Sequence, residues 1–156
     1  MHWTKIPGLS QENMEQFFHD AMKPGSYLKH HGVIPRMDPR FVGCDFEKGT
    51  AEFAYDAMEW ELNPEDILHG GIISTALDTS MGSLAHYYTH LSAPTVVTVT
   101  MNVSFLKPIA LGDTFRIICQ LDSLGRTLAT VKAEVRLEKG DVLAGISTAT
   151  FMSVKE

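Results

Sequence analysis

The chain has 156 residues, of which 44% are hydrophobic and 21% charged, and its formal net charge at pH 7 is −6. This length and composition are typical of one globular domain with a substantial core. An acidic chain without a run of lysine or arginine lacks the basic surface that nucleic-acid binding requires, and no apolar run approaches the roughly 18 to 20 residues that span a membrane. We therefore expect a cytoplasmic single-domain protein that binds neither nucleic acid nor membrane.

Residues 1–40 are expected to form one helix followed by an irregular segment. Ser10 can cap a helix in which apolar residues recur at helical spacing, namely Met14, Phe17, Phe18, Ala21 and Met22. Pro24-Gly25 ends this helix, and further glycine and proline residues predict an irregular stretch over 26–40.

Residues 41–156 are expected to form the core of the domain. Two strands near 41–47 and 50–56 are joined by a tight turn at Lys48-Gly49. A long helix follows from about Pro64 to Tyr88, with a wide apolar stripe formed by Ile73, Ala76, Leu77, Ser80, Met81, Leu84 and Tyr88. This helix has two unusual features, the glycine pair Gly70-Gly71 near its start and Asp78 beside its apolar stripe.

The last third of the chain alternates polar and apolar residues over four predicted strands, 96–105, 114–124, 128–138 and 142–154. The connections contain "LGD", "LGR" and "KGD", which place Gly112, Gly125 and Gly140 where a hairpin needs a residue that tolerates positive φ. Strands joined by such short turns are antiparallel. The only large apolar partner for such a sheet is the long helix, so we predict an α+β fold in which a curved sheet wraps around one helix.

This architecture, together with "NPEDILHGG" followed by Asp78, resembles the hotdog-fold acyl-CoA thioesterases, and in particular the small phenylacetate-pathway type. The resemblance covers about residues 40 to 154. It depends on Asn63 six residues before His69-Gly70-Gly71, on Asp78 eight residues after Gly70, and on the strand "VVTVTMNVSFLKP". It implies a hydrolase that converts small-to-medium acyl- or aryl-CoA thioesters to free acid and CoA. No metal or redox cofactor is implied, and coenzyme A enters as part of the substrate.

The resemblance also implies roles for individual residues. Asp78 would be the nucleophile or the general base that activates water, and the Gly70 backbone N–H would polarise the thioester carbonyl. Asn63 would lie beside the thioester and the attacking water, and Thr98 would hydrogen-bond that water or the carboxylate. Two positions differ from the family, which often has serine at position 98 and glycine at position 66. Asp66 can still form the turn, because aspartate tolerates the left-handed region better than most residues.

Substrate contacts are expected from both apolar and charged residues. His69 would orient the loop, and Gly71 would lie beside the substrate. Met81, Leu84 and Phe105 would line a pocket for an apolar acyl group of modest size. The phosphates of coenzyme A would meet nearby cations, for which the candidates are Lys107, Arg116, Arg126 and Lys132.

The spacing of Gly70 and Asp78 predicts the assembly. Eight residues at 1.5 Å rise place them about 12 Å apart along one helix. Hydrogen-bond contact with one carbonyl needs both groups within about 3 Å of it. If both act, Gly70 and Asn63 of one chain must face Asp78 and Thr98 of another, so we expect at least a homodimer. The family often pairs such dimers, and a dimer of dimers is therefore expected.

Less specific interpretations of the motif remain open. The two glycines could be a packing pair against a neighbouring strand. Asp78 could bond to Ser74 or Thr75 on the preceding turn, or simply reach solvent. His69 with Asp78 could serve a hydratase or dehydratase that moves a proton beside the carbonyl. A non-catalytic acyl-CoA-binding protein would bind the thioester without turnover.

Other chemistry-bearing residues fit structural roles. His86 and His90 have the i and i+4 spacing of zinc ligands, but the intervening glutamate pattern of a metalloprotease is absent and we expect no metal. Cys44 and Cys119 are far apart and form neither a disulfide framework nor a metal-ligand pattern. We expect both as reduced thiols packed as small hydrophobic residues.

Overall fold

The computed structural model describes residues 2–155. The helices are α1 (Gln11–Ala21), α2 (Ile34–Met37) and α3 (Gly70–Thr89). The strands are β1 (Arg40–Asp45), β2 (Thr50–Asp56), β3 (Thr95–Phe105), β4 (Thr114–Leu124), β5 (Leu128–Leu137) and β6 (Val142–Val154). Short 3₁₀ turns are η1 (His2–Lys5), η2 (Glu59–Glu61) and η3 (Lys139–Asp141). No helix within residues 2–155 is long and apolar enough to cross a membrane.

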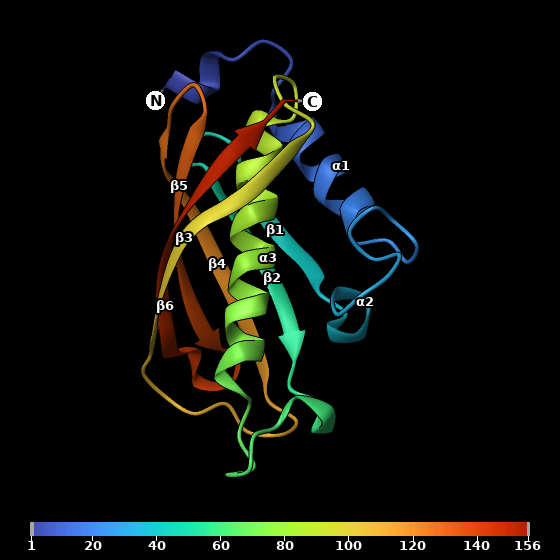
Figure 1. The fold of residues 1–156 in the computed structure, drawn as a ribbon, viewed down its shortest axis with the longest axis vertical. Helices are drawn as coiled ribbons and strands as arrows, with labels where there is room; N and C mark the ends of the chain where they lie inside the picture. Colours follow the sequence, from blue (N-terminus) through green and yellow to red (C-terminus); the bar gives the residue numbers. More distant parts are fainter. Residues whose placement is uncertain (1, 156) are drawn as a thin grey trace.

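The strands form one antiparallel sheet in the order β1-β2-β4-β5-β6-β3. The sheet curves around α3, which runs along its concave face, while α1 and α2 lie on the other side of that helix (Figure 1). The predicted α+β fold with one central helix is therefore confirmed.

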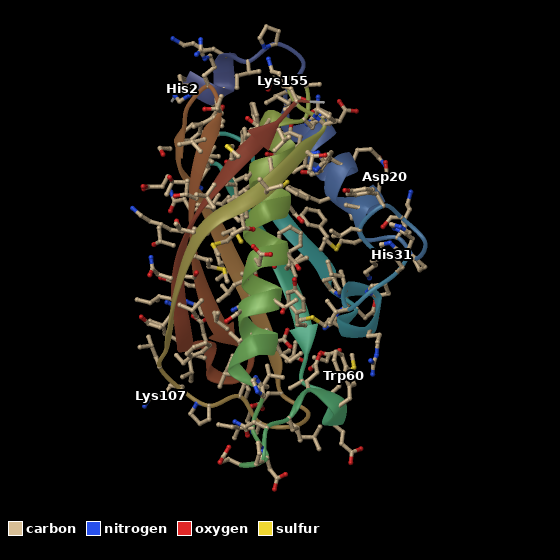
Figure 2. The ribbon with its side chains drawn as sticks, in the orientation of Figure 1. His2, Asp20, His31, Trp60, Lys107 and Lys155 are labelled. Atoms are coloured by element: carbon tan, nitrogen blue, oxygen red, sulfur yellow. The ribbon has the colours of Figure 1, made fainter. Side chains whose placement is uncertain are left out.

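The core lies between α3 and the sheet (Figure 2). The predicted stripe of α3 is buried along its whole length, and Leu77, Met81 and Leu84 are 0% exposed. Tyr55 of β2 reaches across to the helix, where its hydroxyl donates to Ala76 O at 3.2 Å and lies 2.8 Å from Ser80 Oγ. This pairing satisfies the polar groups that the small residues of the stripe bring into the core.

The long helix begins later than predicted, at Gly70 instead of Pro64. Asn63 closes a turn in its place: its Oδ1 accepts the N–H groups of Glu65 and Ile67 at 3.0 and 3.3 Å. Asp66 adopts a left-handed φ of 58°, which cannot continue a helix. The expectation that Asp66 would form the turn of a glycine is thereby confirmed.

The connection after β3 is not a hairpin. β3 pairs with β6, with Met101 opposite Ala149, and β4 instead lies between β2 and β5. The chain between β3 and β4 crosses to the segment that precedes α3, where Leu68 N donates to Ile109 O at 2.8 Å. Ile109 is 1% exposed, so its burial accounts for this path.

The glycine predictions for the turns hold at two positions of three. Gly112 and Gly140 have φ of 84° and 78°, whereas Gly125 does not have positive φ. At Gly125 a Cβ atom would lie 3.3 Å from the Leu128 carbonyl oxygen, to which the Gly125 N–H donates at 2.8 Å. Glycine is needed there for close approach of two backbone segments instead of a left-handed turn.

The predicted boundaries of the first third need smaller corrections. The stretch expected to be irregular contains the single helical turn α2. The β1–β2 turn extends over residues 46–49, because Asp45 Oδ1 accepts Lys48 N–H at 2.9 Å and Phe46 O accepts Gly49 N–H at 3.3 Å. Ser10 caps α1 as predicted, accepting Asn13 N–H at 3.3 Å.

Candidate active site

The segment before α3 forms a compact loop around Asn63. The backbone N–H of Asn63 donates to Ile67 O at 2.8 Å, and the backbone carbonyl of Asn63 accepts Asp66 N–H at 3.0 Å. Because the side-chain oxygen is occupied by two backbone N–H groups, the amide NH₂ is the part of Asn63 left for another partner. Asn63 is thus held in one orientation by its own loop.

Buried Glu61 fixes both ends of this loop. Glu61 is 2% exposed, its carboxylate accepts Met58 N–H at 3.0 Å, and its backbone carbonyl accepts His69 N–H at 2.9 Å. Burial raises the pKa of the Glu61 carboxyl. Glu61 therefore connects the turn η2 to the start of α3.

His69 is the N-cap of α3. Its Nδ1 accepts Gly71 N–H at 2.9 Å, so the neutral ring carries its proton on Nε2. A Cβ atom at Gly71 would lie 3.1 Å from that Nδ1, which explains why glycine follows the cap. His69 is exposed, and its side chain caps the start of α3.

Gly70 is the first residue of the helix, and its N–H has no hydrogen-bond acceptor within residues 2–155. A Cβ atom at Gly70 would lie 3.3 Å from Phe105 Cζ, so the ring of Phe105 packs over this backbone. The packing explanation for the glycine therefore has a partner in β3. The Gly70 N–H is also a backbone donor, unpaired within the described chain, at the N-terminus of a long helix, which is the positive end of the helix dipole.

Asp78 lies two turns further along α3, and Thr98 Oγ1 of β3 donates to its Oδ1 at 2.5 Å. The hydroxyls of Ser74 and Thr75 do not contact this carboxylate, because they donate to Gly70 O and Gly71 O at 2.8 and 2.9 Å. Asp78 is half-buried and its second oxygen has no hydrogen-bond partner within the described chain. The pair presents a carboxylate oxygen that can accept a proton.

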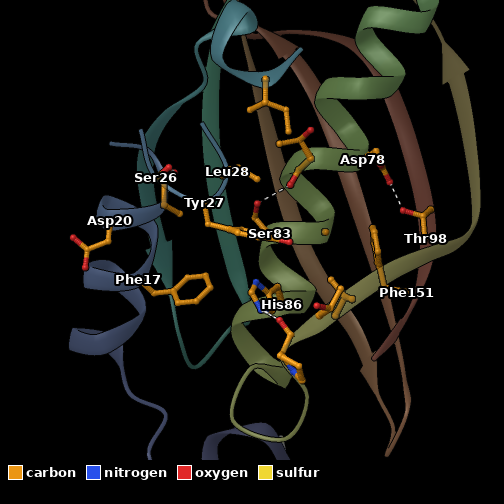
Figure 3. A pocket seen from close by; sticks show the side chains of 17 residues that line it. Phe17, Asp20, Ser26, Tyr27, Leu28, Asp78, Ser83, His86, Thr98 and Phe151 are labelled. Atoms are coloured by element: carbon orange, nitrogen blue, oxygen red, sulfur yellow. Dashed lines mark hydrogen bonds between the residues drawn. The ribbon is translucent and has the colours of Figure 1, made fainter. Parts of the chain in front are cut away.

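A cavity of about 550 Å³ opens beside this pair (Figure 3). Its walls come from one face of α3, from the start of β3 with Phe151, and from α1 with the segment after it. The lining residues are Phe17, Asp20, Ala21, Ser26, Tyr27, Leu28, Ile34, Asp78, Thr79, Gly82, Ser83, His86, Pro94, Thr95, Val96, Thr98 and Phe151. The volume is in the range of small-molecule sites.

The site residues predicted from sequence separate into two groups. Asp78 and Thr98 line the cavity, whereas Asn63, His69, Gly70, Gly71, Phe105 and Lys107 lie at the other end of α3, where Lys107 is exposed. Within one chain the structure does not bring the two groups together.

Met81 and Leu84 do not line the cavity, contrary to prediction. They point to the sheet and are 0% exposed, because the cavity uses the opposite face of α3 with Gly82, Ser83 and His86. The walls from α1 and residues 26–34 were not predicted. Phe17 was recognised only as part of a helical stripe, and the spacing alone does not tell a core contact from a cavity wall.

The two histidines late in α3 use ring nitrogens in hydrogen bonds. His86 Nε2 lies 3.0 Å from Pro94 O, and His90 Nδ1 lies 2.6 Å from Tyr87 O. Burial lowers the pKa of His86. A neutral His86 donates to the Pro94 carbonyl, so it closes the loop between α3 and β3 at one end of the cavity.

The cations expected to meet coenzyme A are not equivalent. Arg116 is paired with Glu52 at 2.6 Å and with Asp141 at 3.0 Å, and Lys132 is paired with Asp122 at 2.5 Å. Lys107 and Arg126 are exposed and form no ion pair within residues 2–155. Of the four candidates, Lys107 and Arg126 are therefore the two free to bind a phosphate.

The family model of the thioesterase superfamily matches residues 65–144. Three solved structures illustrate the likeness. The PaaI protein of the E. coli phenylacetic acid degradation operon has a TM-score of 0.77 at 16% identity, over 93% of this chain and 96% of its own. A phenylacetic acid degradation-related protein of Ralstonia eutropha JMP134, described as a putative thioesterase, has a TM-score of 0.75 at 26% identity, over 87% of this chain and 98% of its own. The protein smu.793 of Streptococcus mutans UA159, solved with acetyl CoA, has a TM-score of 0.65 at 26% identity, over 75% of this chain and 90% of its own.

A comparison with curated proteins gave no match. The family model spans more than half of the chain and includes α3, β3 and the residues between them. The curved antiparallel sheet around one helix is the hotdog fold of the structures above. The chain therefore belongs to the thioesterase superfamily, as a hotdog-fold thioester hydrolase that resembles the phenylacetate-degradation branch.

Proposed function

We propose that this hydrolase cleaves acyl-CoA thioesters as a two-fold dimer, in which Asp78 and Thr98 of one subunit face Gly70 and Asn63 of the partner subunit. The observation that carries the proposal is the order of contacts between α3 and β3. Asp78 contacts Thr98, and Gly70 contacts Phe105. α3 and β3 therefore run antiparallel, and each of the two groups on α3 has a neighbour on β3.

β3 provides the edge at which two chains can meet. It is an 11-residue strand at the end of the sheet, and Val97 and Val99 on it are 41% and 52% exposed. A long exposed edge strand with apolar side chains favours pairing with another strand. Antiparallel pairing of two copies of β3 about a two-fold axis between Met101 and Asn102 would place Thr98 opposite Phe105 of the partner subunit.

This pairing would complete the site. Asp78 lies with Thr98, and Gly70 lies with Phe105, so the axis would bring the carboxylate of one subunit near the helix N-terminus of the other. The thioester carbonyl would accept the unpaired N–H of Gly70. One such donor to a developing oxyanion is worth about 3 kcal/mol, or a factor of 10² to 10³ in rate.

The reaction then follows from the groups present. The unpaired oxygen of Asp78 takes a proton from water as the water oxygen adds to the carbonyl carbon, or it attacks that carbon directly and the mixed anhydride is hydrolysed. The tetrahedral intermediate expels the CoA thiolate, which takes up a proton, and the acyl group leaves as the acid. The Asn63 amide NH₂ would orient the attacking water.

Coenzyme A as the leaving group is supported by smu.793, which is 26% identical and was solved with acetyl CoA. Lys107 is exposed two residues after Phe105, at the same end as Gly70, and would bind a phosphate of the CoA. Lys107→Ala should then raise KM for CoA esters and leave unchanged the KM for N-acetylcysteamine esters, which have no phosphate. An equal rise for both substrates would contradict this role.

The first test is thiol release from phenylacetyl-, benzoyl- and hexanoyl-CoA by the wild type and Asp78→Asn. We expect turnover by the wild type and a loss of at least about 100-fold in the variant, within the usual range for removing a general base. Absence of turnover across the panel would contradict the proposed substrates.

The dimeric site has a sharper test, in which Asp78→Asn and Asn63→Ala chains are co-expressed. Each variant alone should be inactive. In a mixed dimer one site receives both substitutions and the other receives none, so a statistical mixture should recover about a quarter of wild-type activity. If both groups acted within one chain, the mixture would stay inactive.

A further inference from the structure

The part of the chain that precedes the family match supplies one wall of the cavity. The family model begins at residue 65, whereas Phe17, Ala21, Leu28 and Ile34 line the cavity from α1 and the segment after it. The opposite wall belongs to the core, with Gly82 of α3, Val96 of β3 and Phe151 of β6. The cavity is therefore shaped by the N-terminal segment as well as by the sheet and α3.

This N-terminal wall is firmly attached to α3. The Tyr87 hydroxyl lies 2.9 Å from Ser10 O and also contacts Asn13 Oδ1, at the N-terminus of α1. Met14 and Phe18 of α1 are 0% exposed, and the ring of Phe18 packs edge-on against Phe53 of the sheet at 5.3 Å. A wall fixed by these contacts sets a definite limit to the space beside Asp78.

The length of this space follows from α3. Asp78 and His86 both line the cavity and are separated by eight residues, or about 12 Å of helix. The Phe17 ring centroid lies 5.6 Å from that of His86, so Phe17 lines the cavity from α1 near His86 and away from Asp78 (Figure 3). An extended hydrocarbon advances about 1.25 Å per carbon, given a C–C bond near 1.52 Å and an angle near 111°. The distance therefore corresponds to roughly eight to ten carbons.

The charge of the walls limits the chemistry of the occupant. The lining residues include Asp20 and Asp78 and no lysine or arginine. The remaining surface is mostly aromatic and aliphatic, with Phe17, Phe151 and Leu28 among its members. An acyl group that carries a free carboxylate, such as glutaryl, would lose the hydration of that charge in the cavity without a cation to pair with it, which is unfavourable.

We propose that the substrate of this hydrolase carries an uncharged acyl group of roughly eight to ten carbons in line, and that Phe17 sets its maximum length. This inference rests on the proposed function, because it places the thioester carbonyl at Asp78. It adds to that function the substrate class and a specificity-determining residue outside the family match.

The test compares kcat/KM for hexanoyl-, octanoyl-, decanoyl-, dodecanoyl-, phenylacetyl- and glutaryl-CoA. Each buried methylene favours the longer chain about fourfold, which is about 0.8 kcal/mol. The wild type should thus have a kcat/KM about 15-fold higher for octanoyl- than for hexanoyl-CoA, with no such gain at dodecanoyl-CoA, and should turn over glutaryl-CoA at least about 100-fold more slowly than octanoyl-CoA. Glutaryl-CoA as a substrate equal to octanoyl-CoA would overturn the charge argument.

Two substitutions of Phe17 should move the preference in opposite directions. Phe17→Ala enlarges the cavity near His86, so the optimum should shift to dodecanoyl-CoA, while Phe17→Trp should shift it to hexanoyl-CoA. Phe18→Leu is the matched control, since Phe18 is buried in the core and does not line the cavity. It should keep the wild-type chain-length profile. Identical profiles in the wild type and both Phe17 variants would refute the role of Phe17.

Binding separates this inference from the proposed reaction. The same proteins are titrated calorimetrically with S-hexyl-, S-octyl-, S-decyl- and S-dodecyl-CoA thioethers, which cannot be hydrolysed. If turnover fails on every ester but affinity rises to S-decyl-CoA, and extends to S-dodecyl-CoA in Phe17→Ala, the proposed reaction is wrong and the acyl pocket stands. If the esters are cleaved but neither rate nor affinity depends on chain length, the reaction stands and the acyl pocket is wrong.

Discussion

The two halves of α3 have opposite environments. Its N-terminal half starts at the surface, where His69 and Gly71 are exposed and the Gly70 N–H is unpaired within residues 2–155. Its C-terminal half is enclosed, with Tyr87 and Tyr88 0% and 4% exposed beneath α1 and the sheet. Asp78 lies at the boundary between the two halves.

This difference separates two tasks along one helix. The open half presents a helix N-terminus whose donor has no use within its own chain, and in our proposal it serves the partner subunit. The enclosed half receives its covering from the same chain, through α1 and residues 26–34. Catalytic completion would thus depend on assembly, while acyl selection would depend on the N-terminal segment.

The packing of α1 over the enclosed half of α3 can be disrupted most strongly at Phe18. Phe18→Ala should lower the free energy of unfolding by about 3 to 5 kcal/mol, because a fully buried ring is replaced by a cavity. Phe17→Ala should cost clearly less, since Phe17 is only half-buried and already borders open space. Urea denaturation of the two variants measures both values. Equal losses would show that Phe17 is a core residue and not a cavity wall.

The boundary between the halves can be tested at Thr98. Thr98→Val removes the hydroxyl that donates to Asp78 and should lower kcat by about tenfold or more, since a hydrogen bond to a charged group contributes about 1.5 to 3 kcal/mol. Thr98→Ser keeps the donor and should retain most of the activity. Steady-state kinetics on octanoyl-CoA compares them. A valine variant as active as the serine variant would exclude a role for this hydrogen bond.

The buried face of α3 was easier to predict from sequence than the start of the helix. The buried stripe of α3 follows directly from helical spacing, and every member of it is buried. The helix start did not follow, because Asn63, Pro64 and the acids after them have the composition of a helix N-terminus. Two features that spacing cannot show decide the true start: the left-handed backbone at Asp66 and a cap supplied by His69, which is not a common capping residue.

Long-range placement was also beyond local patterns. The composition around Gly112 is that of a hairpin, yet Ile109 and Leu68 hold this segment against the start of α3 and send β3 to the far edge of the sheet. The pairing of Asp78 with Thr98 came from the resemblance to a family and not from periodicity. The cavity wall at Phe17 had no signal, because helical spacing places Phe17 and Phe18 on the same stripe.

The attachment of α1 can be weakened by one atom at Tyr87. Tyr87→Phe removes the hydroxyl that contacts Ser10 and Asn13, and should lower the free energy of unfolding by about 1 kcal/mol. Thermal and urea denaturation measure this loss. Tyr88→Phe is a matched comparison, because the Tyr88 hydroxyl donates at 2.9 Å to Phe46 O and reaches α1 only through a weak 3.9 Å contact with Met14 Sδ. If α1 alone is loosened, only Tyr87→Phe should broaden the preference for acyl chain length.

The smallest expected effect is a pH dependence from His86, in the enclosed half. Burial lowers the pKa of His86 in the folded state, so the unfolded chain binds more protons near and below a pKa of about 6.5. The free energy of unfolding should therefore fall as pH decreases through about 6.5, and His86 should contribute nothing to its pH dependence well above that value. His86→Gln, whose amide can still donate to Pro94 O, should reduce this fall in urea titrations at pH 7.5 and 5.5. The enclosed half would then be sensitive to acid through the residue that closes its loop, and an equal fall in the wild type and His86→Gln would exclude this role of His86.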